Sequence, residues 1–152
     1  MEIVDAGETR FLRENGFLER GAKLSYNQLM RLSPEHFEEL AFEIAEKILA
    51  DLPADLRAEA ETVILEVADR PTWEQTGGEG TLLGLYEGVP LVQRHADSTL
   101  LQPDHITLFR EPLQSLARTE SQLRRHIRVT LVHELGHFFG FDEDELRALG
   151  WA

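Results

Sequence analysis

The longest regular pattern in the chain predicts one helix of about five turns that carries a continuous apolar side. It begins at Thr119, where Thr119 and Gln122 fit a capping box, and it continues to Phe139. Its apolar residues recur every four positions, at Leu123, Ile127, Leu131, Leu135 and Phe139. Such a side must pack against other elements, so the remainder of the chain has to supply them.

A second amphipathic helix is predicted after Ser33 and Pro34, which suit the N-cap and the first helical position. Its apolar residues at helical spacing are Phe37, Leu40, Ala41, Ile44, Ile48 and Leu52. Pro53 ends this pattern, and a short helical stretch can follow over residues 54–61. The length of 152 residues suits one domain, because two halves would each bury too little apolar surface.

Several short segments rich in apolar and β-branched residues are expected to form strands. They are residues 62–67, 82–86, 88–92 and 104–110. In the third of these, Pro90 belongs at an edge or a bend because it lacks a backbone donor. Trp73 and Trp151 are most simply core or interface residues.

Charge and composition exclude several classes of function. A formal net charge of -13 argues against a nucleic-acid or anionic-membrane partner, since both are bound through Lys and Arg. The chain has no cysteine, so disulfides and thiolate metal ligands are excluded. No signal-peptide pattern or apolar run of membrane-spanning length is present, so a soluble cytoplasmic protein is expected. The oligomeric state is not specified.

The C-terminal part of the long predicted helix contains the motif HELGH, His133 to His137. Its two histidines lie one turn apart on the same side, so two imidazole nitrogens can bind one ion at roughly 2.0–2.1 Å. Glu134 is about a quarter-turn away from His133, which suits it to hold a water rather than the ion. The alternative is a pair of ordinary surface or core histidines, because this motif also occurs by chance.

Two glycines and a run of carboxylates favour the metal site. Gly136 costs about 1 kcal/mol in a helix relative to Ala, which indicates close packing or access at this point. Gly140 suits a left-handed helix terminus that reverses the chain. Such a reversal can bring Asp142, Glu143 or Asp144 back toward the ion.

Three segments in order resemble the minimal zincin-like metallopeptidases, small bacterial proteins with an HExxH motif. They are LLGLYEGVPL (residues 82–91), PDHITLFREPL (residues 103–113) and HELGHFFGFDEDEL (residues 133–146). The resemblance covers residues 33–152 as the zincin-like domain, and residues 1–32 remain an N-terminal extension whose structure the sequence does not specify. It implies a compact α+β fold, in which a small mixed sheet packs on the HExxH helix and on the second amphipathic helix.

The resemblance also implies a Zn2+ cofactor, a peptide or protein substrate, and hydrolysis of peptide bonds. Carried over to this sequence, His133 and His137 become zinc ligands and Glu134 the general base. An acidic residue past the glycine becomes the third ligand. A second hypothesis is a non-catalytic or metal-free module that keeps the zincin shape and binds a protein partner through its cleft.

The third ligand is predicted to be Glu143, with Asp142 and Asp144 as rivals. Glu143 stands ten residues after His133, where the metzincin pattern supplies its third ligand after a helix-ending glycine. The chain is not a standard metzincin, because that position holds histidine in metzincins. The Met-turn is also impossible, since Met1 and Met30 are the only methionines.

Three further expectations concern residues near the motif. Tyr86 could donate to an oxyanion, but a strand tyrosine packed on the sheet is the simpler interpretation. His126 could support the site, but the surrounding arginines favour a solvated histidine. The strand HITLF (residues 105–109), if it lies at the sheet edge, would let an extended peptide add to it as a further strand.

Overall fold

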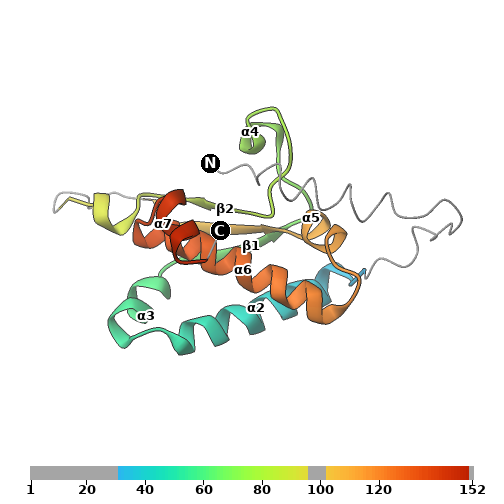
Figure 1. The fold of residues 1–152 in the computed structure, drawn as a ribbon, viewed down its shortest axis with the longest axis horizontal. Coiled ribbons are helices and arrows are strands. Elements are labelled where there is room, and N and C mark those ends of the chain that lie inside the picture. The colour runs from blue at the N-terminus through green and yellow to red at the C-terminus, as the bar shows by residue number, and fades with distance from the viewer. Residues whose placement is uncertain (1–30, 96–101, 151–152) are drawn as a thin grey trace, which may run out of the picture.

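A computed structural model of the protein describes residues 31–95 and 102–150 (Figure 1). Its strands β1 (Ile64–Ala68), β2 (Gly84–Glu87) and β3 (His105–Phe109) form one sheet in the order β1-β3-β2. β3 pairs in parallel with β1 and antiparallel with β2, so the sheet is mixed. The predicted α+β fold with a small mixed sheet is confirmed.

Helices make up most of the rest of the described chain. They are α2 (Pro34–Asp51), α3 (Ala54–Ala60), α4 (Trp73–Thr76), α5 (Arg110–Ser115), α6 (Glu120–Phe139) and α7 (Glu143–Ala148), with the 3-10 turn η2 (Leu91–Gln93). The two long amphipathic helices, α2 and α6, were predicted. No helix within the described residues is long and apolar enough to span a membrane.

The main core lies between the sheet and the two long helices, which lie side by side (Figure 1). α2 begins as predicted, because the Ser33 hydroxyl accepts a hydrogen bond from the His36 N–H. α6 also begins as predicted, with the Thr119 hydroxyl accepting from the Gln122 N–H. Only half of the predicted capping box forms, since the Gln122 side chain accepts from the Arg118 N–H instead.

The buried side of α6 changes along its length. Leu123, Ile127 and Leu131 are buried as predicted, but Leu135 and Phe139 are only partly buried. Toward the C-terminal end, Glu134 and Phe138 occupy the buried side. α6 packs on α2 and also on the edge strand β2. Because its packing partner changes along its length, different side chains are buried near its C-terminal end.

The predicted role of HITLF as an edge strand is wrong. β3 has β1 on one side and β2 on the other, so its backbone donors and acceptors are used within the sheet. β2 and β1 are the edge strands. The pairing of β3 with a strand 41 positions before it in the chain is a non-local contact that the local pattern does not encode.

Other local expectations need correction. Residues 88–92 form no strand, because Pro90 bends the chain into η2. Trp73 is not a core residue: it is 74% exposed at the start of α4, and its ring lies against Gly78. Trp151 and most of the N-terminal extension lie outside the described residues. The division at residue 33 stays a prediction.

Gly84 lets α6 pack directly on the backbone of β2. A Cβ atom at this position would lie 2.6 Å from Cγ2 of Thr130 and 3.2 Å from Cγ of Glu134. Real Cβ atoms essentially never come as close as 2.6 Å to another side-chain atom, so any larger residue must push the helix and the strand apart. The close approach places the Glu134 carboxylate beside β2.

We predict that Gly84→Ala destabilises the fold by about 1–3 kcal/mol, because the added methyl overlaps Thr130. The measurement is chemical unfolding of the parent and the variant. Thr130→Ser removes Cγ2, the atom that the methyl would overlap, and should restore part of the loss when combined with Gly84→Ala. An unchanged free energy of unfolding for Gly84→Ala alone would contradict the tight contact.

Candidate metal centre

The structure brings the side chains of His133, His137 and Glu143 together. Nε2 of His133 lies 3.1 Å from Nε2 of His137, and Oε1 of Glu143 lies 3.1 Å from the first nitrogen and 3.0 Å from the second. The two histidines come from successive turns of α6, and the glutamate is the first residue of α7. Among the described residues, these three form a group that could hold a metal ion.

The donor atoms of this group fit a divalent ion. Two imidazole nitrogens and a carboxylate oxygen are ligands that zinc accepts, and a tetrahedral zinc with bonds of ~2.1 Å separates its ligand atoms by roughly 3.4 Å. The observed separations of 3.0–3.1 Å are close to that spacing. Lone pairs this near to one another repel unless a cation or protons lie between them.

A chain reversal after α6 puts Glu143 in place. Gly140 ends the helix in the left-handed conformation, with φ of 102°, as predicted. The Phe141 N–H then donates to the carbonyl of Gly136, which is a bond typical of this helix terminus. α7 starts two residues later and lies against the last turns of α6.

Gly136 allows α7 to pack closely on α6. A Cβ atom at Gly136 would lie 2.4 Å from Cδ2 of Leu146, a fully buried side chain of α7. The predicted close packing at this glycine is therefore present. Leu146 is one turn beyond Glu143 on the same short helix, so its contact with Gly136 helps to position Glu143.

The rival aspartates have other partners. Asp142 is the N-cap of α7: its carboxylate accepts from the Glu145 N–H, and the Glu145 side chain accepts from the Asp142 N–H. Asp144 pairs with Arg147 and its side chain is 93% exposed. Glu143 is the residue of the three that reaches the histidines.

The reversal also orients one histidine ring. Nδ1 of His137 lies 3.1 Å from the carbonyl oxygen of Phe141, which can only accept a hydrogen bond. The ring proton therefore belongs on Nδ1, and this leaves the lone pair on Nε2 facing His133 and Glu143. No signal in the sequence identifies this backbone carbonyl as part of the site.

Glu134 is buried, and one oxygen of its carboxylate is bound to the sheet. It is 4% exposed, and its Oε2 accepts a hydrogen bond of 2.9 Å from the Tyr86 N–H in β2. Glu134 and His137 both line a hollow of about 470 Å³, so the carboxylate has access to the space beside the three predicted ligands.

The Tyr86 side chain packs behind the site, as the simpler interpretation predicted. Its hydroxyl donates to Oδ1 of Asp104 over 2.6 Å, and its ring meets the edge of Phe138. Burial, followed by this carboxylate, raises the pKa of the phenol. Asp104 also pairs with Arg94. Sequence reasoning did not identify Arg94 and Asp104 as part of this region, because no spacing rule links either of them to Tyr86.

His126 does not join the predicted ligands. It lies half-buried in the first half of α6, where burial and the nearby Arg125 lower its pKa. The predicted solvated histidine is therefore only partly correct. His105 lies 3.5 Å from Glu66 on the neighbouring strand, also apart from the group.

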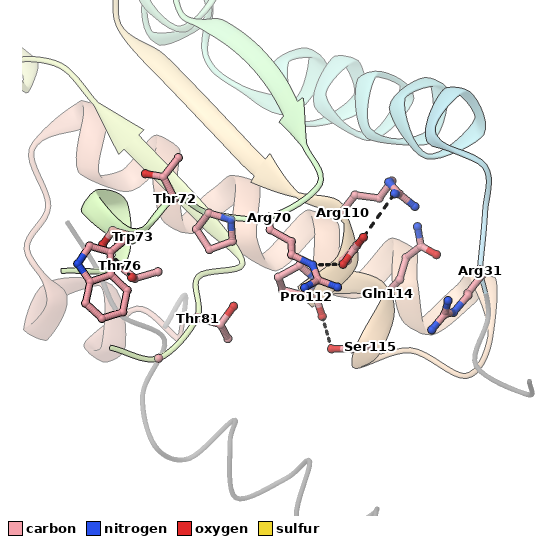
Figure 2. Close-up of a pocket in the computed structure, with 13 residues that line it drawn as sticks. Arg31, Arg70, Thr72, Trp73, Thr76, Thr81, Arg110, Pro112, Gln114 and Ser115 are labelled. Carbon is pink, nitrogen blue, oxygen red and sulfur yellow. Dashed lines mark hydrogen bonds and ion pairs between the residues drawn. The ribbon is translucent and has the colours of Figure 1, made fainter. Parts of the chain in front are cut away.

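A larger hollow of about 660 Å³ lies between α4 and α5 (Figure 2). Figure 2 shows Arg70 and Arg110 converging at its rim, where both pair with Glu111. Arg110 also pairs with Asp69. The lining residues supply no set of metal ligands, so this hollow is not the candidate centre.

We predict that Gly136→Ala lowers metal affinity at least about tenfold, because the methyl displaces Leu146 and with it Glu143. The measurement is competition with a chromogenic chelator for Zn2+.

The matched control adds Leu146→Ala, which removes the atoms that the new methyl would overlap. The double variant should bind metal more tightly than Gly136→Ala alone. If Gly136→Ala binds metal as tightly as the parent, then this contact does not position the predicted third ligand.

Comparison with known proteins shows the family of the chain. A search of curated proteins found no match to the sequence. The family model described as zincin-like metallopeptidase matches residues 60–151, which include the sheet, α6 and α7. Because this match covers more than half of the 152 residues, the protein belongs to the family of zincin-like metallopeptidases.

Proposed function

We propose that the protein is a zinc-dependent peptidase in which His133, His137 and Glu143 hold the ion and Glu134 is the general base. The observation that carries this proposal is the close triangle of three ligand atoms next to a buried carboxylate. Membership in a metallopeptidase family supports it. The absence of cysteine leaves His and carboxylate as the available strong ligands.

Zinc at this site would supply a Lewis acid that polarises the scissile carbonyl and lowers the pKa of water. Glu134 accepts the proton of the attacking water and transfers it to the leaving amine nitrogen as the C–N bond breaks. The Tyr86 N–H in β2 donates to Oε2 of this carboxylate and fixes the side chain beside the hollow that His137 also lines. Burial of Glu134 limits its competing contacts with bulk water.

The substrate that fits this cleft is an extended peptide. β2 is an edge strand, and Leu85, Tyr86 and Gly88 line the hollow that contains Glu134 and His137. The main chain of a peptide can bind beside such an edge through backbone hydrogen bonds, which require no particular side chain. Broad cleavage of unstructured substrates is expected.

Glu134→Gln should retain zinc and lose hydrolysis, because glutamine preserves the size of the side chain but cannot accept the proton. The expected loss in kcat is about 10²- to 10⁴-fold. Hydrolysis of an unstructured protein is measured alongside zinc content. Activity within about threefold of the parent would exclude Glu134 as the base, and a zinc-loaded parent that cleaves nothing would favour the non-catalytic binding module.

Alanine substitution at each of the three neighbouring acids tests the third ligand. Glu143→Ala should weaken zinc binding more than about tenfold, because it removes one of three protein ligands. Asp142→Ala should cost about 1 kcal/mol of stability through the lost N-cap, with a smaller effect on zinc. Asp144→Ala should have little effect on either.

Zinc affinity by chelator competition and thermal unfolding separate these outcomes. If affinity is unchanged in Glu143→Ala and falls at either aspartate, the ligand is that aspartate. If no variant changes affinity, the histidines bind metal without help from α7, or they do not bind it.

A further inference from the structure

A buried charge cluster behind the cleft has no part in the chemistry proposed so far. Asp104, immediately before β3, is 6% exposed and contacts two groups: the Tyr86 hydroxyl at 2.6 Å and the guanidinium of Arg94. A carboxylate with so little access to water is costly unless it is paired and hydrogen-bonded. Each of these two partners of Asp104 also contacts other residues near the cleft.

Tyr86 connects this cluster to the predicted base. Its hydroxyl donates to Asp104, and its backbone N–H donates to Oε2 of Glu134. Tyr86 therefore binds two buried carboxylates: that of Asp104 through its hydroxyl and that of Glu134 through its backbone N–H. The ring between them packs on Phe138, which is next to His137 in α6.

Arg94 connects the cluster to the segment that follows β2. Its Nε donates to the carbonyl of Val89 over 2.9 Å, and its guanidinium carbon lies 5.5 Å from the centre of the Phe138 ring. A cation at this distance from an aromatic face is attracted to it. Arg94 thus joins the chain at Val89 to both β3 and α6.

Residues 88–94, which we name the wall segment, form one side of the hollow. Gly88, Pro90 and Gln93 line it together with Glu134 and His137. The two backbone bonds of η2 are internal to the segment, so they do not attach it to the rest of the domain. The ion pair between Arg94 and Asp104 does attach it.

The wall segment fits closely at two further points. A Cβ atom at Gly88 would lie 2.1 Å from Oδ1 of Asp104, so the backbone itself rests on the carboxylate. A Cβ atom at Gly140 would lie 2.3 Å from Cγ2 of Val92, at the end of the helix that carries the histidines. The position of the wall therefore depends on Asp104 at one end and on α6 at the other.

We propose that Asp104 is a positioning residue that, through Arg94 and Tyr86, holds the wall segment in the orientation in which it binds the substrate peptide. The substrate part of this proposal rests on the proposed peptidase function. Asp104 does not touch the reacting atoms, and its effect is on how firmly the wall is held.

The first test measures amide hydrogen exchange in the zinc-loaded, full-length protein and needs no substrate. Asp104→Asn keeps the shape of the side chain but removes its charge, so exchange at residues 88–94 should accelerate at least about tenfold while α2 stays unchanged. The control with the same change, Asp69→Asn, removes one of the two acidic partners of Arg110 at the other end of the sheet and should leave exchange in the wall segment unchanged. Equal exchange of the wall segment in Asp104→Asn and the parent overturns the proposal.

Two Arg94 variants test the link independently, in case Asp104→Asn folds poorly. Arg94→Gln should accelerate exchange in the wall segment as Asp104→Asn does. Arg94→Lys keeps a charge for Asp104 but cannot also bind the Val89 carbonyl in the same geometry, so an intermediate effect is expected. If Arg94→Gln leaves exchange in the wall segment at the parent rate, the proposal fails.

The second test separates substrate binding from chemistry. For an unstructured peptide, Asp104→Asn should raise KM about tenfold, with kcat and zinc affinity within about threefold of the parent. A lower kcat at unchanged KM would place the effect on catalysis and contradict the wall role. Should the parent cleave no peptide, the peptidase function fails, while hydrogen exchange still decides whether Asp104 holds the wall.

Discussion

Direct packing of α6 on the backbone of β2 is the contact on which the site depends. It requires a residue without a side chain at Gly84, because Thr130 and Glu134 occupy the space where a Cβ would be. The same approach brings the Glu134 carboxylate within hydrogen-bond distance of the Tyr86 N–H. A buried carboxylate of this kind would be unfavourable if the strand did not supply a donor.

The second constraint is the reversal of the chain at the end of α6. Two glycines permit it for different reasons: Gly140 adopts a positive φ, and Gly136 leaves room for Leu146. Together they return α7 to the helix that it follows, so that Glu143 meets the two histidines. Asp142 stabilises the start of α7 as its cap, and its neighbour Glu143 is thereby directed toward the two histidines.

The polar groups around the cleft are tied to more than one element. Tyr86 joins β2 to α6 through its backbone and to the start of β3 through its hydroxyl. Arg94 joins the wall segment to Asp104 and to Phe138. Such links allow a few side chains to connect β2, β3, α6 and the wall segment around one hollow.

The sequence by itself determined the features that depend on local spacing. Helical periodicity and capping residues predicted α2 and α6, and the spacing of His133 and His137 placed both rings on one side of a helix. The left-handed terminus followed from Gly140, because glycine adopts that conformation without strain. The ten-residue offset selected Glu143 as a candidate, although its role as a ligand stays a prediction.

Only the tertiary structure decided what distant segments do to one another. The central position of β3, the burial of Glu134 on β2 and the cluster of Asp104 with Arg94 all join residues that no period connects. Which strand lies at the edge of the sheet depends on how all the strands pair. The partner of a buried charged group likewise depends on which segments the fold brings next to it. The periodicity of a segment shows which side of that helix or strand is buried. It does not show which other helix or strand packs on that side, because this depends on contacts between residues far apart in the chain.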